Sequence, residues 1–167
     1  MSTFNGLPAH VLFVHFIVVL APLTAVLAIL CAVWPAARQR LVWLVLALSL
    51  AVAVLTPLTT EAGEWLEHRV ERSALLHTHT ELGDTMIYFS AGLLLVAVLL
   101  AVLHLRSSRG KSVSTVLTAL VAVLAVVVGA ATVVQVYRIG DSGAKATWSD
   151  TPLTAPSSEK PGEEPGE

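Results

Sequence analysis

The chain has 167 residues, enough for a single domain. Hydrophobic residues make up 55% of it and charged residues 13%, against about 25% charged residues in a typical soluble domain, so the composition excludes an ordinary soluble protein. The formal net charge of -2 excludes a general electrostatic attraction to nucleic acid. We therefore expect the lipid bilayer, and not nucleic acid, to be the main partner.

Four apolar runs are long enough to cross a bilayer, which takes roughly 20 helical residues. They cover residues 11–34, 41–58, 86–105 and 113–137. Pro35 closes the first run, an acidic segment after Thr60 closes the second, and Arg138 with Gly140 ends the fourth. The sequence therefore predicts an all-α fold, a four-helix transmembrane bundle of two hairpins, with residues 1–148 as the membrane domain.

The charges of the short loops predict the orientation of the bundle. The loops between spans one and two and between spans three and four carry Arg38, Arg40, Arg106, Arg109 and Lys111. Positive charge near span ends is retained in the cytoplasm, so both hairpin turns should face inward and both termini outward. All twelve acidic residues then fall outside. We expect a multi-pass protein of the cell membrane, with residues 149–167, rich in Pro, Gly and Glu, as a disordered extracytoplasmic tail.

Several histidines should lie at one height near the outer surface. The 28 residues from His10 to Arg38 span about 42 Å of helix, and the 27 from His79 to Arg106 span about 40 Å. A slightly deeper layer is predicted to hold His15, Asp84, Glu61, Glu64 and Gln135. Ionisable groups at the hydrocarbon boundary usually face the bundle interior and a partner, so these side chains should converge.

This convergence leaves three interpretations open. In the first, His15 and Asp84 form a hydrogen-bonded pair that only locks two helices. In the second, His10 and His79 are axial ligands of a b-type haem, and His15, Asp84 and Glu61 surround them. In the third, His15, Asp84 and Glu61, with His79, bind a divalent metal such as zinc, iron or manganese.

Four segments resemble one family of bacterial membrane proteins. These are Gly6-Leu7-Pro8-Ala9-His10, Val14-His15-Phe16, His79-x-x-x-Gly83 and the stretch 136–144. Their order and placement resemble the domain of unknown function 2231 family over roughly residues 6–148. The resemblance implies an uncharacterised four-helix membrane protein, similar in architecture to small b-type cytochromes, in which histidines on facing helices hold haem. Such similarity of architecture does not by itself transfer a function.

The function hypotheses follow from the predicted site. The sequence lacks the motifs of nucleotide binding and of soluble hydrolases, and it leaves open whether the protein is an enzyme. The first hypothesis is an integral membrane protein that binds haem or a metal ion for electron transfer, working with a redox partner or as a homo-oligomer. The alternative is a non-catalytic membrane scaffold or assembly subunit whose polar layer is structural.

Overall fold

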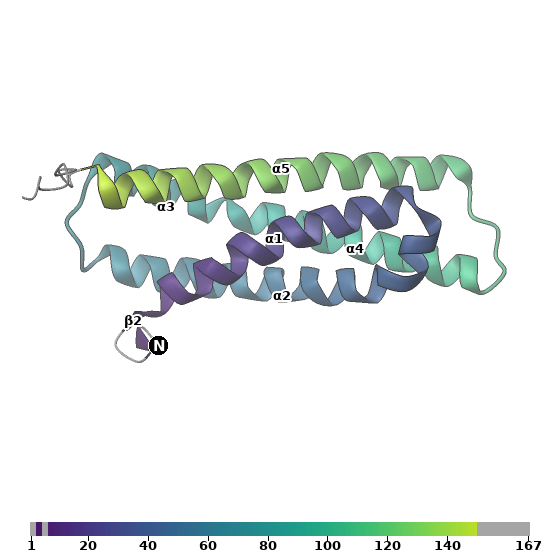
Figure 1. Ribbon diagram of the computed structural model, residues 1–167, viewed down its shortest axis with the longest axis horizontal. Helices are drawn as coiled ribbons and strands as arrows, with labels where there is room; N and C mark the ends of the chain where they lie inside the picture. Colours follow the sequence, from purple (N-terminus) through teal and green to yellow (C-terminus); the bar gives the residue numbers. More distant parts are fainter. Residues whose placement is uncertain (1–2, 5–6, 150–167) are drawn as a thin grey trace, which may run out of the picture.

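The computed structural model describes residues 3–4 and 7–149. The elements are β1 (Thr3–Phe4), β2 (Leu7–Pro8), α1 (Ala9–Val33), α2 (Pro35–Glu67), α3 (Ala74–Asp84), α4 (Met86–Ser108) and α5 (Thr115–Trp148), shown in Figure 1. The predicted all-α four-helix bundle is confirmed, with α3 and α4 together as its third member; the two short strands only form an antiparallel pair before α1. The predicted tail from residue 150 onward lies outside the described residues.

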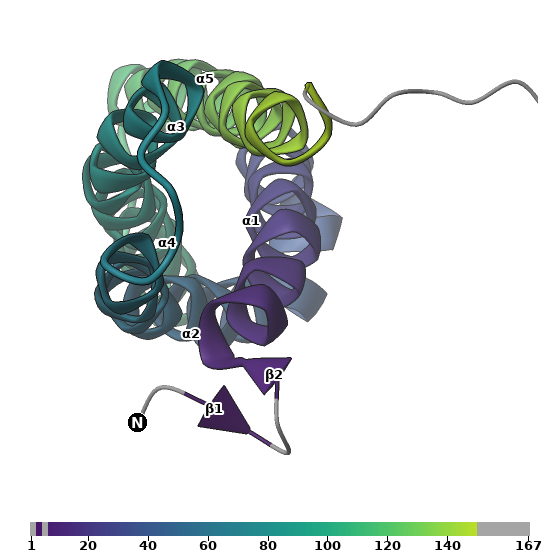
Figure 2. The same cartoon turned by 90° about the vertical axis from the view of Figure 1, so that its left-hand side faces the viewer.

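The helices form a ring in which α1 and α4 stand diagonally opposite each other. Helix α1 packs against α2 and α5, α4 packs against the same two helices, and α3 packs mainly on α5 (Figure 2). We call the end that holds the start of α1 and the end of α5 the terminal end, and the opposite end the hairpin end (Figure 1). Both predicted hairpin turns lie at the hairpin end, as expected for two helical hairpins that enter the membrane from the same side. The side of the membrane that each end faces stays a prediction.

Three helix boundaries differ from the predicted spans. Helix α2 begins at Pro35, so Trp34 alone separates it from α1, and proline suits this position because the first residue of a helix needs no N–H partner. Helix α2 continues to Glu67 and α5 to Trp148, well beyond the predicted ends. Hydropathy shows where apolar residues stop, whereas the Ala, Glu and Lys that follow continue a helix readily. Both helices therefore extend the bundle at the terminal end.

Small side chains let the helices approach closely inside the bundle. The fully or almost fully buried small residues include Ala21, Ala25, Ser49, Thr56, Ser90, Ala97, Ala125, Gly129 and Thr132. In lipid, no hydrophobic effect drives helices together, so they associate through van der Waals contact. Small residues make this contact possible because they let the helix backbones come close. Larger apolar side chains complete two clusters: one near the hairpin end around Val45, Val96 and Leu100, and one toward the terminal end around Ile17, Val52 and Met86.

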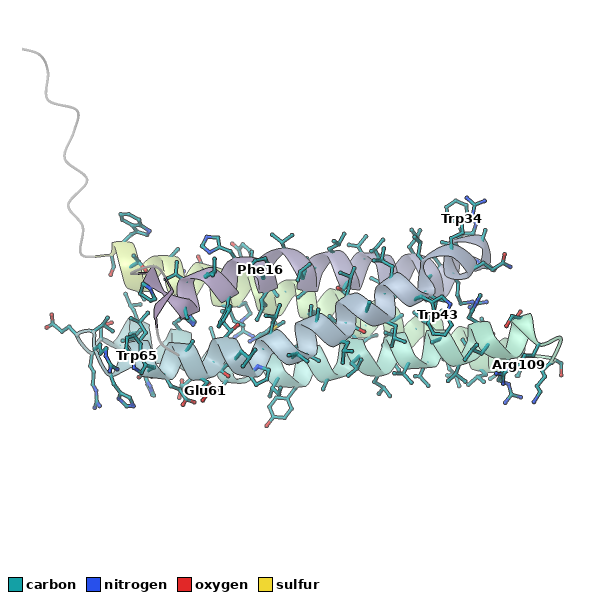
Figure 3. All side chains as sticks on the ribbon, turned by 90° about the horizontal axis from the view of Figure 1, so that it is seen from below. Phe16, Trp34, Trp43, Glu61, Trp65 and Arg109 are labelled. Carbon is teal, nitrogen blue, oxygen red and sulfur yellow. The ribbon has the colours of Figure 1, made fainter. Side chains whose placement is uncertain are left out.

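The outer surface of the bundle is apolar along most of its length. On α5, Val116 is 68% exposed, Val123 61% and Val134 56%. Four helical segments are long and apolar enough to cross a membrane in the described part of the chain. The labelled Trp34 and Trp43 lie toward the hairpin end and Trp65 toward the terminal end (Figure 3), where amphipathic rings meet the headgroup level. The protein is thus a multi-pass membrane protein whose exposed valines and leucines contact lipid.

Candidate functional site

The structure brings the imidazoles of His10 and His79 together at the terminal end. His10 is the second residue of α1, and His79 lies in the middle of α3. Their ring centres are 6.3 Å apart and their planes are nearly perpendicular, at 86°. Both side chains are partly buried. The height calculation from the sequence predicted that these two residues lie level, and here they face each other.

The ring of His10 is held by α2. Its Nδ1 lies 2.9 Å from the main-chain oxygen of Thr59, and a carbonyl can only accept, so Nδ1 carries the proton and donates it. Gly63, one turn later on α2, presses against the same edge of the ring: a Cβ at this glycine would be 3.0 Å from Nδ1. Glycine therefore lets the backbone of α2 approach the imidazole closely, whereas a side chain here would push the ring aside by a few tenths of an ångström.

The ring of His79 is held by α5 in the same way. Its Nδ1 lies 3.1 Å from the main-chain oxygen of Ile139 and 3.1 Å from the Oγ of Ser142. The Ser142 hydroxyl itself donates to Ile139 O at 2.9 Å, so its oxygen is free to accept from the histidine. A Cβ at Gly143 would be 2.9 Å from Cε1 of the ring.

The two halves of the site are therefore built alike. In each half, the histidine Nδ1 donates to a carbonyl on a neighbouring helix, and a glycine four residues after that carbonyl allows the close approach. With the proton on Nδ1, the neutral form of each ring has a lone pair on Nε2. Ile17 and Met86, each seven residues beyond its histidine, belong to the apolar cluster next to the pair.

The structure does not assemble the deeper layer predicted around this pair. His15, Asp84 and Glu61 are exposed, and Figure 3 shows Glu61 on the outside of α2. The Nδ1 of His15 donates to the Val11 carbonyl of its own helix. The expected hydrogen bond between His15 and Asp84 is not formed. These three residues therefore do not surround the imidazole pair.

Helix geometry explains this correction. His15 follows His10 by five residues, and Asp84 follows His79 by five, so each is rotated by about 140° from its histidine around the helix axis. When His10 and His79 face inward, the other two must face outward. Glu61, two residues from Gly63, is rotated by about 160° from it in the same manner.

The residues predicted to bind a divalent metal do not come together either, because three of them face outward. Within residues 3–4 and 7–149, no group of three or more His, Cys, Asp or Glu side chains is placed to hold a metal ion. Of its four candidate ligands, His79 alone faces the interior, while His15, Asp84 and Glu61 lie apart at the surface.

Gln135 is the one member of the deeper layer that the structure buries. Its Nε2 donates to the Leu82 carbonyl at 3.1 Å and to the Thr85 hydroxyl at 2.7 Å. Thr85 is the residue between α3 and α4. Gln135 thus ties α5 to the connection between α3 and α4, one to two turns from His79.

The remaining histidines lie apart from the pair. His77 is exposed and lies 3.4 Å from Glu81 on the same helix. His68 is exposed at the end of α2, and His104 packs edge-on against Trp43 near the hairpin end, with ring centres 6.1 Å apart.

Sequence reasoning missed the residues that hold the two rings. They are Thr59, Gly63, Ile139, Ser142 and Gly143. Two of them contribute only a main-chain oxygen, which any residue type could supply. The available signal was a glycine at the height of each histidine, but the second one lay beyond the predicted end of the fourth span.

The chain matches a known family of membrane proteins. A family model described as "Predicted membrane protein (DUF2231)" matches residues 6–155, which includes all the residues of the imidazole pair and its supports. No curated protein and no solved structure matches the chain.

Proposed function

The chain belongs to the DUF2231 family of predicted membrane proteins, and we propose that it is an electron-transfer protein in which His10 and His79 are the axial ligands of a b-type haem. The observation that carries this proposal is the matched pair of imidazoles, 6.3 Å apart, on two different helices. A bound haem supplies reversible one-electron oxidation and reduction at its iron.

The separation of the rings fits one ion between them. An ion about 2.0–2.1 Å from each of two imidazole nitrogens places the ring centres about 6 Å apart. The pair of His10 and His79 has this spacing without any rearrangement of the backbone. Two unliganded histidines in a bundle need not meet at this distance.

The protonation of the rings also supports axial ligation. A ligating histidine usually donates its other ring N–H to a carbonyl or carboxylate, which fixes the tautomer and the ring orientation. His10 donates to Thr59 and His79 donates to Ile139, so each Nε2 is available as a ligand. Ser142 adds a second acceptor to His79 alone, which makes the environments of the two rings unequal.

The small number of donors favours haem over a bare ion. A structural zinc site takes four protein ligands and a catalytic one takes three, and the described residues offer no such group. In a haem, the porphyrin supplies four nitrogen ligands to the iron, so the protein needs to supply only two. In four-helix bundles, cofactor sites are built from side chains on facing helices, and His10 and His79 likewise meet from two different helices.

The proposed location is the plasma membrane, with the histidine pair near its outer face. The basic hairpin loops support this orientation, because they should stay in the cytoplasm. Electrons would then pass between the haem and a redox partner, or a second copy of the chain, at the terminal end.

The test is the absorption spectrum of the full chain purified in detergent from haem-sufficient cells. We expect a Soret band with stoichiometric haem, and its loss in His10→Ala and in His79→Ala. His15→Ala and His77→Ala are the matched controls, because both histidines are exposed on the same two helices as the pair and should leave the band unchanged. Folded protein with no Soret band would refute the proposal.

A structural role is the second candidate. The hydrogen bonds of His10 to α2 and of His79 to α5 join pairs of helices through residues that are 49 and 60 positions apart in the chain, as a structural role requires. In that case both alanine variants should lower the thermal stability of the bundle while the wild type carries neither haem nor metal.

A further inference from the structure

A polar pocket lies at the hairpin end, between the start of α2 and the end of α4. Its volume is about 380 Å³, and its lining residues are Pro35, Arg38, Gln39, His104, Ser107 and Ser108. The imidazole of His104 is kept in place by its edge-on contact with Trp43. The lining therefore combines a guanidinium, an imidazole and hydroxyl groups, which are donors suited to an anion.

Arg38, which lines this pocket, carries a hydrogen-bond donor without a partner in the described part of the chain. Its Nη1 is buried and, among the described residues, has no hydrogen-bond partner. A buried guanidinium N–H without an acceptor is unfavourable, so a ligand that supplies an oxygen would be stabilised here. A guanidinium can present two parallel N–H groups, which match the oxygens of a phosphate.

The charge around the pocket points the same way. Four further basic residues, all exposed, belong to this end of the bundle: Arg40, Arg106, Arg109 and Lys111. The sequence has no Asp or Glu in residues 1–60 or 85–140, so the helices and loops of this end provide no carboxylate to pair with these cations. The start of α2 and the end of α4 both adjoin the pocket, so their helix dipoles oppose each other and its positive charge comes from the basic side chains.

We propose that this pocket binds the phosphate group of an anionic phospholipid, with Arg38 as its main contact. The height of the pocket favours a lipid headgroup over free phosphate, because the exposed indoles of Trp34 and Trp43 mark this end as the membrane interface. Basic pockets between membrane helices on the cytoplasmic side recognise anionic headgroups in this way. The site is separate from the histidine pair and does not depend on haem.

The experiment is native mass spectrometry of the full chain in detergent, titrated with phosphatidylglycerol, with phosphatidylcholine or with inorganic phosphate. We expect phosphatidylglycerol to remain bound in preference to phosphatidylcholine. Arg38→Gln should weaken its retention about tenfold, equivalent to the loss of one charge-assisted hydrogen bond. Arg40→Gln removes the same charge from an exposed position of the same helix and should weaken it less than twofold.

Three results would overturn the proposal. Equal losses in Arg38→Gln and Arg40→Gln would show general attraction to a basic surface, and full displacement of the lipid by millimolar phosphate would show a site for the free anion. If Arg38→Gln does not fold, Gln39→Glu tests the same pocket from an exposed position. The new carboxylate should compete for Arg38 and reduce retention of phosphatidylglycerol, and unchanged retention would also overturn the proposal.

Discussion

Gly63 lies against the imidazole of His10, so that a Cβ at this glycine would be 3.0 Å from Nδ1. Gly143 has the same relation to His79, with a Cβ position 2.9 Å from Cε1. The backbones of α2 and α5 thus approach the two rings more closely than a residue with a Cβ would allow without a shift. A methyl group at either glycine would have to move the ring, and each ring is anchored by a carbonyl one turn away.

We therefore predict that Gly143→Ala disturbs the site. The added methyl should lower the free energy of unfolding by about 1–3 kcal/mol, because a close-packed position must rearrange. Gly140→Ala is the matched control on the same helix: a Cβ there meets nothing within 4 Å, and alanine favours a helix by up to about 1 kcal/mol over glycine. Circular dichroism of thermal unfolding in detergent measures both. Equal effects of the two substitutions would contradict the close approach at Gly143.

A second prediction concerns Gln135, which joins α5 to the break between α3 and α4. Gln135→Leu should remove two hydrogen bonds and leave the Thr85 hydroxyl and the Leu82 carbonyl with fewer partners, at a cost of about 1–3 kcal/mol. Hydrogen exchange of the amides around residue 85 should become faster. Val134→Leu, an exposed neighbour that faces lipid, should leave exchange unchanged. Unaltered exchange in Gln135→Leu would show that the joint is stable without this side chain.

A third prediction tests the close contact between α1 and α5. A Cβ at Gly129 would be 2.8 Å from Cδ1 of Ile29, so Gly129→Ala should destabilise the bundle. Ile29→Val removes that Cδ1 and, alone, should cost about 0.5–1.5 kcal/mol. Together the two changes should cost less than their sum, with a coupling of at least about 0.5 kcal/mol. Strict additivity in a double-mutant cycle would place the contact elsewhere.

A fourth prediction concerns orientation in the membrane. In intact cells, an impermeant thiol reagent should label Glu71→Cys, in the connection between α2 and α3, and should not label Ser112→Cys, in the connection between α4 and α5. Both positions are exposed, so the difference reports the side of the membrane. The background should carry Cys31→Ala, which removes the buried native thiol. The reverse labelling pattern would contradict the loop-charge argument.

Much of the fold could be predicted because it follows from the length of the apolar runs. The same counting along straight helices placed His10 level with His79. It could not give the rotation of each helix, which depends on partners from other helices. A spacing of five residues turns His15 and Asp84 away once their histidines face inward, and this constraint was already present in the sequence.

The supports of the two rings could not be predicted for a different reason. Ile139 and Thr59 act through main-chain oxygens, which every residue type has, so these contacts cannot be recognised from the sequence. Ser142 and Gly143 lie beyond the apolar part of the fourth span, where the helix continues although the hydrophobic signal has ended. A membrane helix that projects past the hydrocarbon can carry site residues that hydropathy never includes.

The link between α1 and α2 has a consequence for engineering. Trp34 is the only residue between these helices, whereas residues 109–114 separate α4 from α5. The connection between α1 and α2 is too short to absorb inserted residues, so an insertion there would change how α1 and α2 cross. A fluorescent protein or epitope tag inserted into the full chain therefore belongs after Gly110, whose backbone is already in the left-handed region and exposed, and not beside the tryptophan.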